Sequence, residues 1–196
     1  MAIKGITKEM IVAETIRYIN ETEKSMVSLH ELARRLEIKT PSLYNHIKNT
    51  EELQYEVFGY AIEQFVRNQK KAIEGKTMDD AIRAFAEAYY MFASENKGLY
   101  RLIMSMPLKN DDTEKEMAVP LLDVVVDILS DYGLDEQSVA HWQRVFRAIL
   151  HGFITQEELG YFYYYDNIEL KESRDIAVEC FINGLHAEVD RRKNEK

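Results

Sequence analysis

Apolar residues recur every three or four positions along nearly the whole chain, and no stretch sustains the strict alternation of a half-buried strand. This spacing predicts an all-α fold of about nine helices. The predicted helices cover residues 7–22, 28–36, 40–47, 50–74, 77–96, 98–106, 113–132, 135–161 and 171–192. Gly75 and Gly133 stand where C-terminal glycine stops are expected, and the polar run 108–113 predicts a loop.

The second and third predicted helices are short and are separated by only three residues, 37–39. Ser28 and Glu31 have the spacing of a capping box, and Thr40 precedes a proline at a position that suits the first turn of a helix. In the third helix Leu43 and Ile47 share one face, whereas the opposite face carries short polar or hydrogen-bonding side chains. The exposed set is Ser42, Tyr44, Asn45 and His46. This arrangement is typical of a recognition helix that enters the major groove of DNA.

The net charge of −9 conceals a division between the two ends of the chain. The first 50 residues carry a net charge of +2 and the remaining residues −11, so a mildly basic head precedes an acidic body. A single cysteine, Cys180, excludes an internal disulfide and suits a reducing compartment. Charged residues interrupt the N-terminal segment, so we expect neither a signal peptide nor a membrane span, and a cytoplasmic location.

The region of the two short helices resembles the DNA-binding signature of the tetracycline-repressor (TetR) family. The matching pattern is Leu29-x-x-Leu32-Ala33-x-x-Leu36-x-Ile38-x-x-x-Ser42-Leu43-Tyr44-x-His46-Ile47-x-Asn49-x-Glu51-Glu52-Leu53. The resemblance implies a three-helix helix-turn-helix domain over residues 1–50 and a larger helical ligand-binding and dimerisation domain over 51–196. Residues 142–162, with His151-Gly152-Phe153, resemble the Trp-His-Gly type of regulatory domain found in part of that family.

Two positions depart from the family pattern. Glu37 stands where the turn usually carries glycine, so the backbone there must use an ordinary residue or accept strain. Thr50 stands where the family has a basic phosphate contact, which Lys48 could replace.

The resemblance also implies a set of DNA contacts. Tyr44 and His46 are expected to contact phosphates. Ser28, Lys39 and Lys48 are expected to contact the flanking phosphates. The candidates for base contact are Thr40, Ser42 and Asn45. The alternative is that Tyr44 packs between helices and His46 is a solvated surface residue. Lys4 and Lys8 either reach an adjacent groove or are ordinary surface lysines.

The body is rich in aromatic and methionine side chains, which suits a pocket for a small hydrophobic effector, although such stripes also form ordinary cores. The candidate pocket residues are Phe85, Tyr89, Phe92, Met104, Trp142, Phe146 and His151, with Gln143 a possible polar group. The last two helices have apolar faces that suit a four-helix dimer interface. The candidate interface residues are Ile149, Phe153, Phe181, Leu185 and Val189. Packing within one chain is the alternative.

Together these features predict a sequence-specific transcriptional repressor. A homodimer would place two recognition helices about 34 Å apart on double-stranded operator DNA, and a small effector of unknown identity would release it. No metal-ligand spacing, phosphate loop or nucleophile motif is found, so we expect no enzyme activity, metal or cofactor. The alternative is a helical protein-interaction module with a degenerate DNA-binding head. The sequence also leaves open that the protein activates transcription instead of repressing it.

Overall fold

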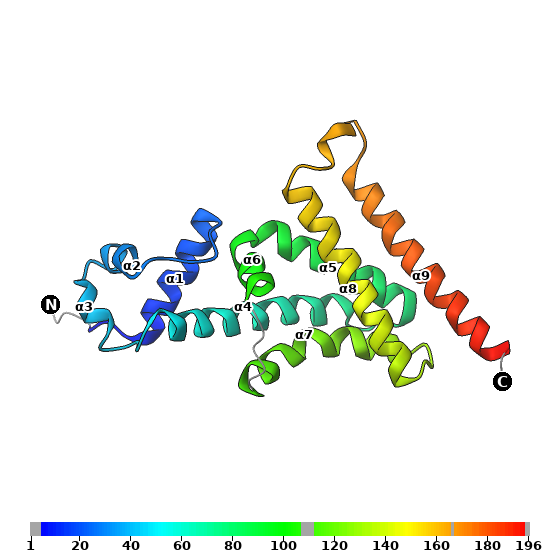
Figure 1. The fold of residues 1–196 in the computed structure, drawn as a ribbon, viewed down its shortest axis with the longest axis horizontal. Helices are drawn as coiled ribbons and strands as arrows, with labels where there is room; N and C mark the ends of the chain where they lie inside the picture. The colour runs from blue at the N-terminus through cyan, green and yellow to red at the C-terminus, as the bar shows by residue number, and fades with distance from the viewer. Residues whose placement is uncertain (1–4, 107–111, 166, 195–196) are drawn as a thin grey trace. The chain divides into compact units, whose positions relative to one another are not determined.

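The computed structural model describes residues 5–106, 112–165 and 167–194. Over these residues the chain forms nine α-helices, one 3₁₀ helix and no strand (Figure 1), which confirms the predicted all-α fold. The helices are α1 (Lys8–Thr22), α2 (Leu29–Arg35), α3 (Thr40–Leu43), α4 (Thr50–Ile73), α5 (Met78–Glu95), α6 (Lys97–Ser105), α7 (Asp112–Ser130), α8 (Glu136–Glu158), η1 (Tyr163–Tyr165) and α9 (Leu170–Asn194). None of the described helices is long and apolar enough to cross a membrane.

The chain folds into two compact units, and each contains segments that are distant in sequence. Unit 1 consists of Met1–Gln64 and Phe92–Met117, and unit 2 of Phe65–Met91 and Ala118–Lys196. These units differ from the expected domains 1–50 and 51–196 because α6 belongs with the first three helices. The expected boundary of the DNA-binding domain at residue 50 stays a prediction.

Unit 1 is built on the contact of α1 with α2 and α6. Its core is mainly aliphatic around α1 to α3, and Ile11, Ile19, Leu32, Leu43 and Leu53 are each at most 2% exposed; Phe58, Phe92 and Tyr100 are also buried in this unit. Gly98, at the start of α6, lets this helix pack close to α1: a Cβ atom there would lie 2.6 Å from Ile19 Cγ2 and 2.7 Å from the Ile19 carbonyl oxygen. The glycine is therefore needed for α6 to pack on α1.

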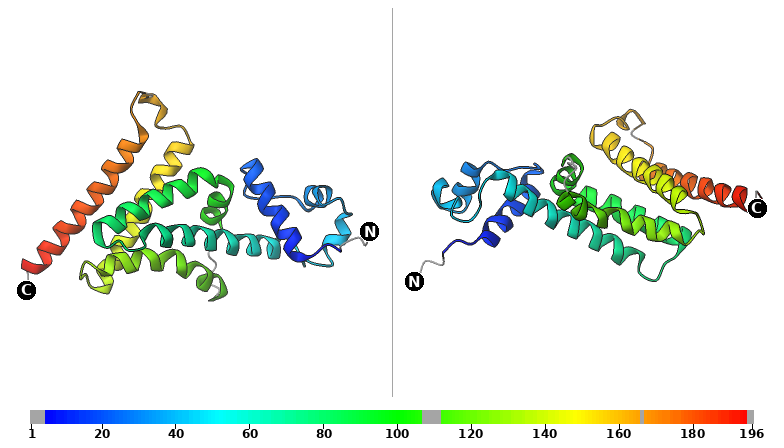
Figure 2. Two further views of the ribbon diagram at one scale, coloured as in Figure 1. Left: turned by 180° about the vertical axis from the view of Figure 1, so that it is seen from behind. Right: turned by 60° about the horizontal axis from the view of Figure 1, so that its bottom comes forward.

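Unit 2 is built around aromatic side chains. The Phe65 ring meets Tyr89 at a centroid distance of 5.0 Å, and Phe85 meets Phe146 at 5.6 Å. Phe146 of α8 in turn stacks on Phe181 of α9, with 4.4 Å between the ring centroids, so the two helices pack against each other there. Figure 2 shows these two helices joined at one end by the connection that contains η1.

Several element boundaries differ from those predicted. The third helix ends at Leu43 instead of Ile47, and residues 44–46 continue it as turns. Lys39, not Thr40, is the residue before its first turn. The eighth helix ends at Glu158 instead of Tyr161, with Asp135 as its N-cap. Of the predicted loop 108–113, residues 108–111 lie outside the described part of the chain, and Asp112 and Thr113 belong to α7 instead.

Candidate nucleic-acid interface

The connection between α2 and α3 has a defined backbone geometry. The Ser28 hydroxyl caps α2 by accepting a hydrogen bond from the Glu31 N–H at 3.2 Å. The other half of the expected capping box is not formed, because the Glu31 carboxylate binds Arg34. At the far end the Ile38 N–H donates to the Ala33 carbonyl and the Glu37 N–H to the Arg34 carbonyl. This is a Schellman ending, and Glu37 adopts the left-handed φ of 55° that it requires.

One partly buried and one exposed ion pair join α2 to α1. Arg35 donates to Glu14 at 2.6 Å and to Glu21 at 2.6 Å, and its guanidinium lies 5.5 Å from the centre of the Tyr18 ring. The Glu14 carboxylate, 8% exposed, also pairs with Arg17. Hydrogen bonds to Glu14 and Glu21 raise the pKa of Arg35, so its guanidinium stays protonated. They fix the angle between the two helices that support α3.

The side chains of α3 and the following turn divide sharply by exposure. Leu43 is fully buried and Ile47 is 2% exposed, whereas the Tyr44 ring is 56% exposed. The remaining candidates are also on the surface: Ser28, Lys39, Asn45 and Lys48 are exposed, and Thr40, Ser42 and His46 are half-buried. The alternative in which Tyr44 packs between helices does not fit this exposure. The DNA contacts themselves stay a prediction.

The start of α4 is stabilised by residues that the sequence reasoning missed. The Asn49 side chain accepts a hydrogen bond from the Glu52 N–H at 2.8 Å, so Asn49 caps α4. The Glu52 carboxylate accepts from the Lys48 N–H at 2.6 Å, and this bond, with one from Lys8, lowers the Glu52 pKa. The Asn-x-x-Glu spacing of positions 49 and 52 was a readable signal for this cap.

Lys8 has a structural partner on α4. Its ammonium pairs with Glu52 at 2.9 Å and Glu56 at 2.7 Å, and both raise its pKa. The ammonium is therefore engaged within unit 1. Lys4, the other lysine considered for an adjacent groove, lies outside the described residues.

The candidate pocket residues fall in both units. In unit 2 Phe85, Tyr89 and Phe146 are buried, and Trp142, half-buried, packs edge-on against Phe181 at 5.4 Å. His151 is half-buried, and this desolvation lowers its pKa, which favours the neutral imidazole. Phe92 and Met104 belong to unit 1. The sequence reasoning missed Gln69, which is fully buried, and neither of its amide atoms has a partner among the described residues.

The candidate dimer residues differ in how much surface they offer. Ile149, Phe153 and Val189 are half-buried, but Phe181 and Leu185 are buried within the chain and have almost no free surface. The most exposed large apolar side chains of α8 and α9 are instead Val145, at 46%, and Ile176, at 58%. At Gly184 an added Cβ atom would lie 3.1 Å from the Trp142 ring of the same chain.

Known proteins share both the sequence and the fold of this chain. The chain is 31% identical over 160 residues to an HTH-type transcriptional regulator of Mycobacterium tuberculosis, a match that covers 79% of this chain and 72% of the relative. It is 27% identical to the regulator YobS of Bacillus subtilis, over 92% of this chain and 93% of the relative. Here HTH denotes the helix-turn-helix motif.

Similar folds are found among solved structures at lower identity. Apo ActR of Streptomyces coelicolor has a TM-score of 0.68 at 15% identity, with 97% and 100% of the two chains covered. A TetR variant of Acinetobacter baumannii in complex with minocycline has a TM-score of 0.62 at 16% identity, with 95% and 97% covered. Residues 82–181 match the family described as tetracyclin repressor-like, C-terminal domain. The chain therefore belongs to the TetR family of helix-turn-helix transcriptional regulators.

Proposed function

We propose that the protein is a dimeric repressor that reads operator DNA with α3 and the turn that follows it, and that a small effector releases it. The observation that supports the DNA-binding part of this proposal is the separation of buried from exposed side chains around residue 44. Buried Leu43 and Ile47 anchor the segment, while Tyr44, 56% exposed, and Asn45 face outward. A short segment anchored in this way can place its polar side chains against phosphates and base edges.

The distribution of charge supports an oriented approach to DNA. The first 50 residues carry a net charge of +2 and the rest −11, so phosphates attract the head and repel the body. Lys39 and Lys48 are exposed on either side of α3, and the structure assigns neither ammonium an ion pair within the described residues. They are therefore the best candidates for contacts with flanking phosphates.

The dimer is proposed to form through α8 and α9. Val145 on α8 and Ile176 on α9 expose apolar surface that a second copy would cover, and Ile149 and Phe153 extend it. A two-fold dimer would present two copies of α3 to a near-palindromic site.

The effector is proposed to bind in the aromatic interior of unit 2. Gln69 lies one helical turn after Phe65, whose ring contacts Tyr89, and Gln143 lies one turn before Phe146. Neither Gln69 amide atom, nor the Gln143 side-chain carbonyl, has a hydrogen-bond partner among the described residues. Each unpaired buried polar atom costs about 1–3 kcal/mol, so a mainly apolar ligand with a few polar atoms would be favoured there. The minocycline complex of the A. baumannii neighbour is a precedent for small-molecule binding in this fold.

Release would follow from a shift in population. α4 begins directly after the DNA-binding segment and carries Phe65, which contacts Tyr89 of the aromatic cluster. A ligand that prefers one arrangement of this cluster can change the spacing of the two heads only through its differential affinity for the two states. The narrower assignment of the C-terminal domain to the Trp-His-Gly type, based on positions 151–153, stays a prediction.

The test is selection of bound sequences from random duplex DNA, followed by fluorescence anisotropy at two salt concentrations. We expect a near-palindromic site and binding that weakens steeply with salt. Asn45→Ala is expected to relax specificity at one base position, at a cost of about 1–3 kcal/mol. Lys48→Ala is expected to weaken all sequences alike and to reduce the salt slope by about 1.

Lys70→Ala is the matched control, because Lys70 is exposed on α4 outside the DNA-binding motif. It should leave both readouts unchanged. Binding without any enriched sequence would reject operator recognition and favour the alternative of a protein-interaction module with a degenerate head.

A further inference from the structure

A groove in unit 2 lies outside the aromatic interior. It runs between α5 and α9, has a volume of about 600 Å³, and is open to solvent. Its lining residues are Lys76, Asp80, Arg83, Ala84, Ala86, Glu87, Tyr90, Lys171, Asp175, Val178 and Glu179. The volume is within the range of ligand pockets, about 300–1,000 Å³.

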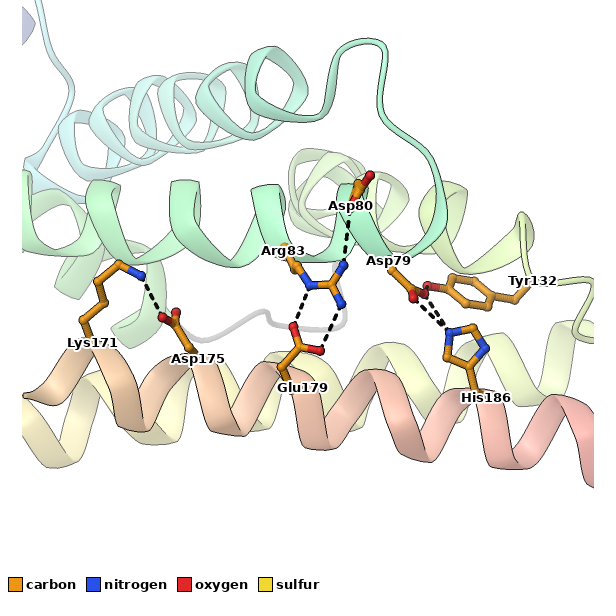
Figure 3. Close-up of polar contacts among 8 residues, drawn as sticks. All are labelled: Asp79, Asp80, Arg83, Tyr132, Lys171, Asp175, Glu179 and His186. Atoms are coloured by element: carbon orange, nitrogen blue, oxygen red, sulfur yellow. Dashed lines mark hydrogen bonds and ion pairs between the residues drawn. The ribbon is translucent and has the colours of Figure 1, made fainter.

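Long polar side chains connect the two helices across this groove. Figure 3 shows α5 and α9 side by side in opposite directions, with Arg83 of α5 pointing toward Glu179 of α9. Arg83 binds both Glu179 carboxylate oxygens, at 2.6 and 2.9 Å. Further along, the Asp79 carboxylate accepts hydrogen bonds from the Tyr132 hydroxyl at 2.6 Å and contacts His186 Nε2 at 2.9 Å. Arg83 and Glu179 line the groove, whereas Asp79, Tyr132 and His186 are not among its lining residues.

The lining combines apolar surface with a charge imbalance at one end. Ala84, Ala86 and Val178 provide the apolar part. Lys171 pairs with Asp175 at 2.7 Å, whereas Glu87 has no ion pair among the described residues. The hydrogen bond from Lys171 to Asp175, together with the nearby Glu87 charge, raises the Lys171 pKa. Among the residues that line the groove at this end, Glu87, Lys171 and Asp175 thus carry one excess negative charge.

Tyr90, at the same end, has an unsatisfied hydroxyl group. The residue is 5% exposed and lines the groove, and its hydroxyl oxygen has no hydrogen-bond partner within the part of the chain that the structure describes. Burial raises the Tyr90 pKa, so the phenol is neutral and can accept a hydrogen bond. The Arg174 guanidinium lies 4.9 Å from the centre of the Tyr90 ring, and its charge is paired with the Glu157 carboxylate at 3.9 Å.

We propose that the groove between α5 and α9 binds an organic ammonium ion with an apolar chain. The chain packs on Ala84, Ala86 and Val178, and the ammonium lies near Glu87 and Asp175, where it donates to the Tyr90 hydroxyl. A carboxylate of the same length is repelled, and an alcohol lacks the charge. This site is separate from the proposed operator contacts and does not depend on them.

The test is isothermal titration calorimetry of the full-length protein, without DNA, against n-octylammonium, octanoate and 1-octanol. We expect n-octylammonium to bind with a dissociation constant at least about tenfold lower than those of the other two, which corresponds to one charge-assisted contact. Glu87→Gln should raise the dissociation constant for n-octylammonium by about tenfold and leave 1-octanol unchanged. Tyr90→Phe should weaken n-octylammonium binding and raise the melting temperature of the free protein, because it removes the unsatisfied hydroxyl.

Glu63→Gln is the matched control, since Glu63 is exposed on α4 in unit 1. It should bind n-octylammonium like the unmodified protein. Equal affinity for octanoate, absence of n-octylammonium binding at 1 mM, or binding that Glu87→Gln does not weaken would each overturn the proposal. The last outcome would place the amine in another cavity. A failure of operator selection would not affect any of these results.

Discussion

At Glu37 a residue with a side chain takes a backbone conformation that favours glycine. Its φ of 55° completes the Schellman ending of α2, and the N–H groups of Glu37 and Ile38 satisfy two carbonyls of that helix. The left-handed conformation costs a residue with a Cβ atom about 1–2 kcal/mol. The departure from the family pattern noted in the sequence is therefore a real local strain.

Glu37→Gly is expected to raise the free energy of unfolding by about 1 kcal/mol, because the relief of strain exceeds the added entropy of the unfolded chain. Urea unfolding monitored by circular dichroism measures it. Glu37→Gln removes the charge but keeps the Cβ atom, and it should leave stability unchanged. An equal gain in both variants would show that charge, and not backbone conformation, is responsible.

At the scale of elements, α6 is held to α1 by a close approach and by polar contacts. Arg101 donates to the Glu23 carbonyl at 2.9 Å, and Lys97 pairs with the Glu23 carboxylate at 3.3 Å. Gly98 lies against Ile19 between these contacts. Sequence periodicity predicted α6 but not this partner, since the contact joins residues about 80 positions apart.

Gly98→Ala is expected to lower the free energy of unfolding by about 1–3 kcal/mol, because its Cβ atom would lie 2.7 Å from the Ile19 carbonyl oxygen. The same substitution at Gly152 in α8 meets no atom within 4 Å. Gly152→Ala should therefore be neutral or stabilising by up to about 1 kcal/mol. Thermal and urea unfolding of both variants provide the comparison, and similar effects at the two glycines would refute the steric explanation.

At the scale of the whole molecule, the proposed function depends on association with a second copy and with DNA. Of the five candidate interface residues, Phe181 and Leu185 are buried by packing within the chain. Periodicity shows which helix face is apolar, but not which neighbour covers it. The proposed dimer surface therefore centres on Val145 and Ile176, whose exposure the structure provides.

Val145→Asp is expected to shift the protein from dimer to monomer in sedimentation velocity, because the interface would bury an unpaired carboxylate. Operator affinity should fall with it, since two linked heads bind more tightly than one. Val119→Asp on α7 is the control: Val119 is 44% exposed and lies outside α8 and α9. A dimer that persists in Val145→Asp would mean that another surface forms the interface.

The sequence by itself determined the all-α fold, the order of the helices and the position of the helix-turn-helix segment. These features are local, because they depend on apolar spacing, on Ser28 as a cap and on the separation of α2 from α3. The helix ends predicted from the sequence were less accurate than the helix order. The capping role of Asn49 and the early end of α3 depend on a competition among neighbouring hydrogen-bonding groups, which spacing alone does not resolve.

Only the tertiary structure decided which long-range pairs form. The packing of α6 on α1, the Arg35–Glu14 ion pair and the stacking of Phe181 on Phe146 join residues far apart in the chain. The same holds for the buried amide of Gln69 and the groove beside Tyr90. Each of these contacts depends on close packing in three dimensions, where a single Cβ atom or an unpaired polar group changes the free energy of folding. The spacing of apolar residues along the chain contains no information on the distances between residues that are far apart in sequence.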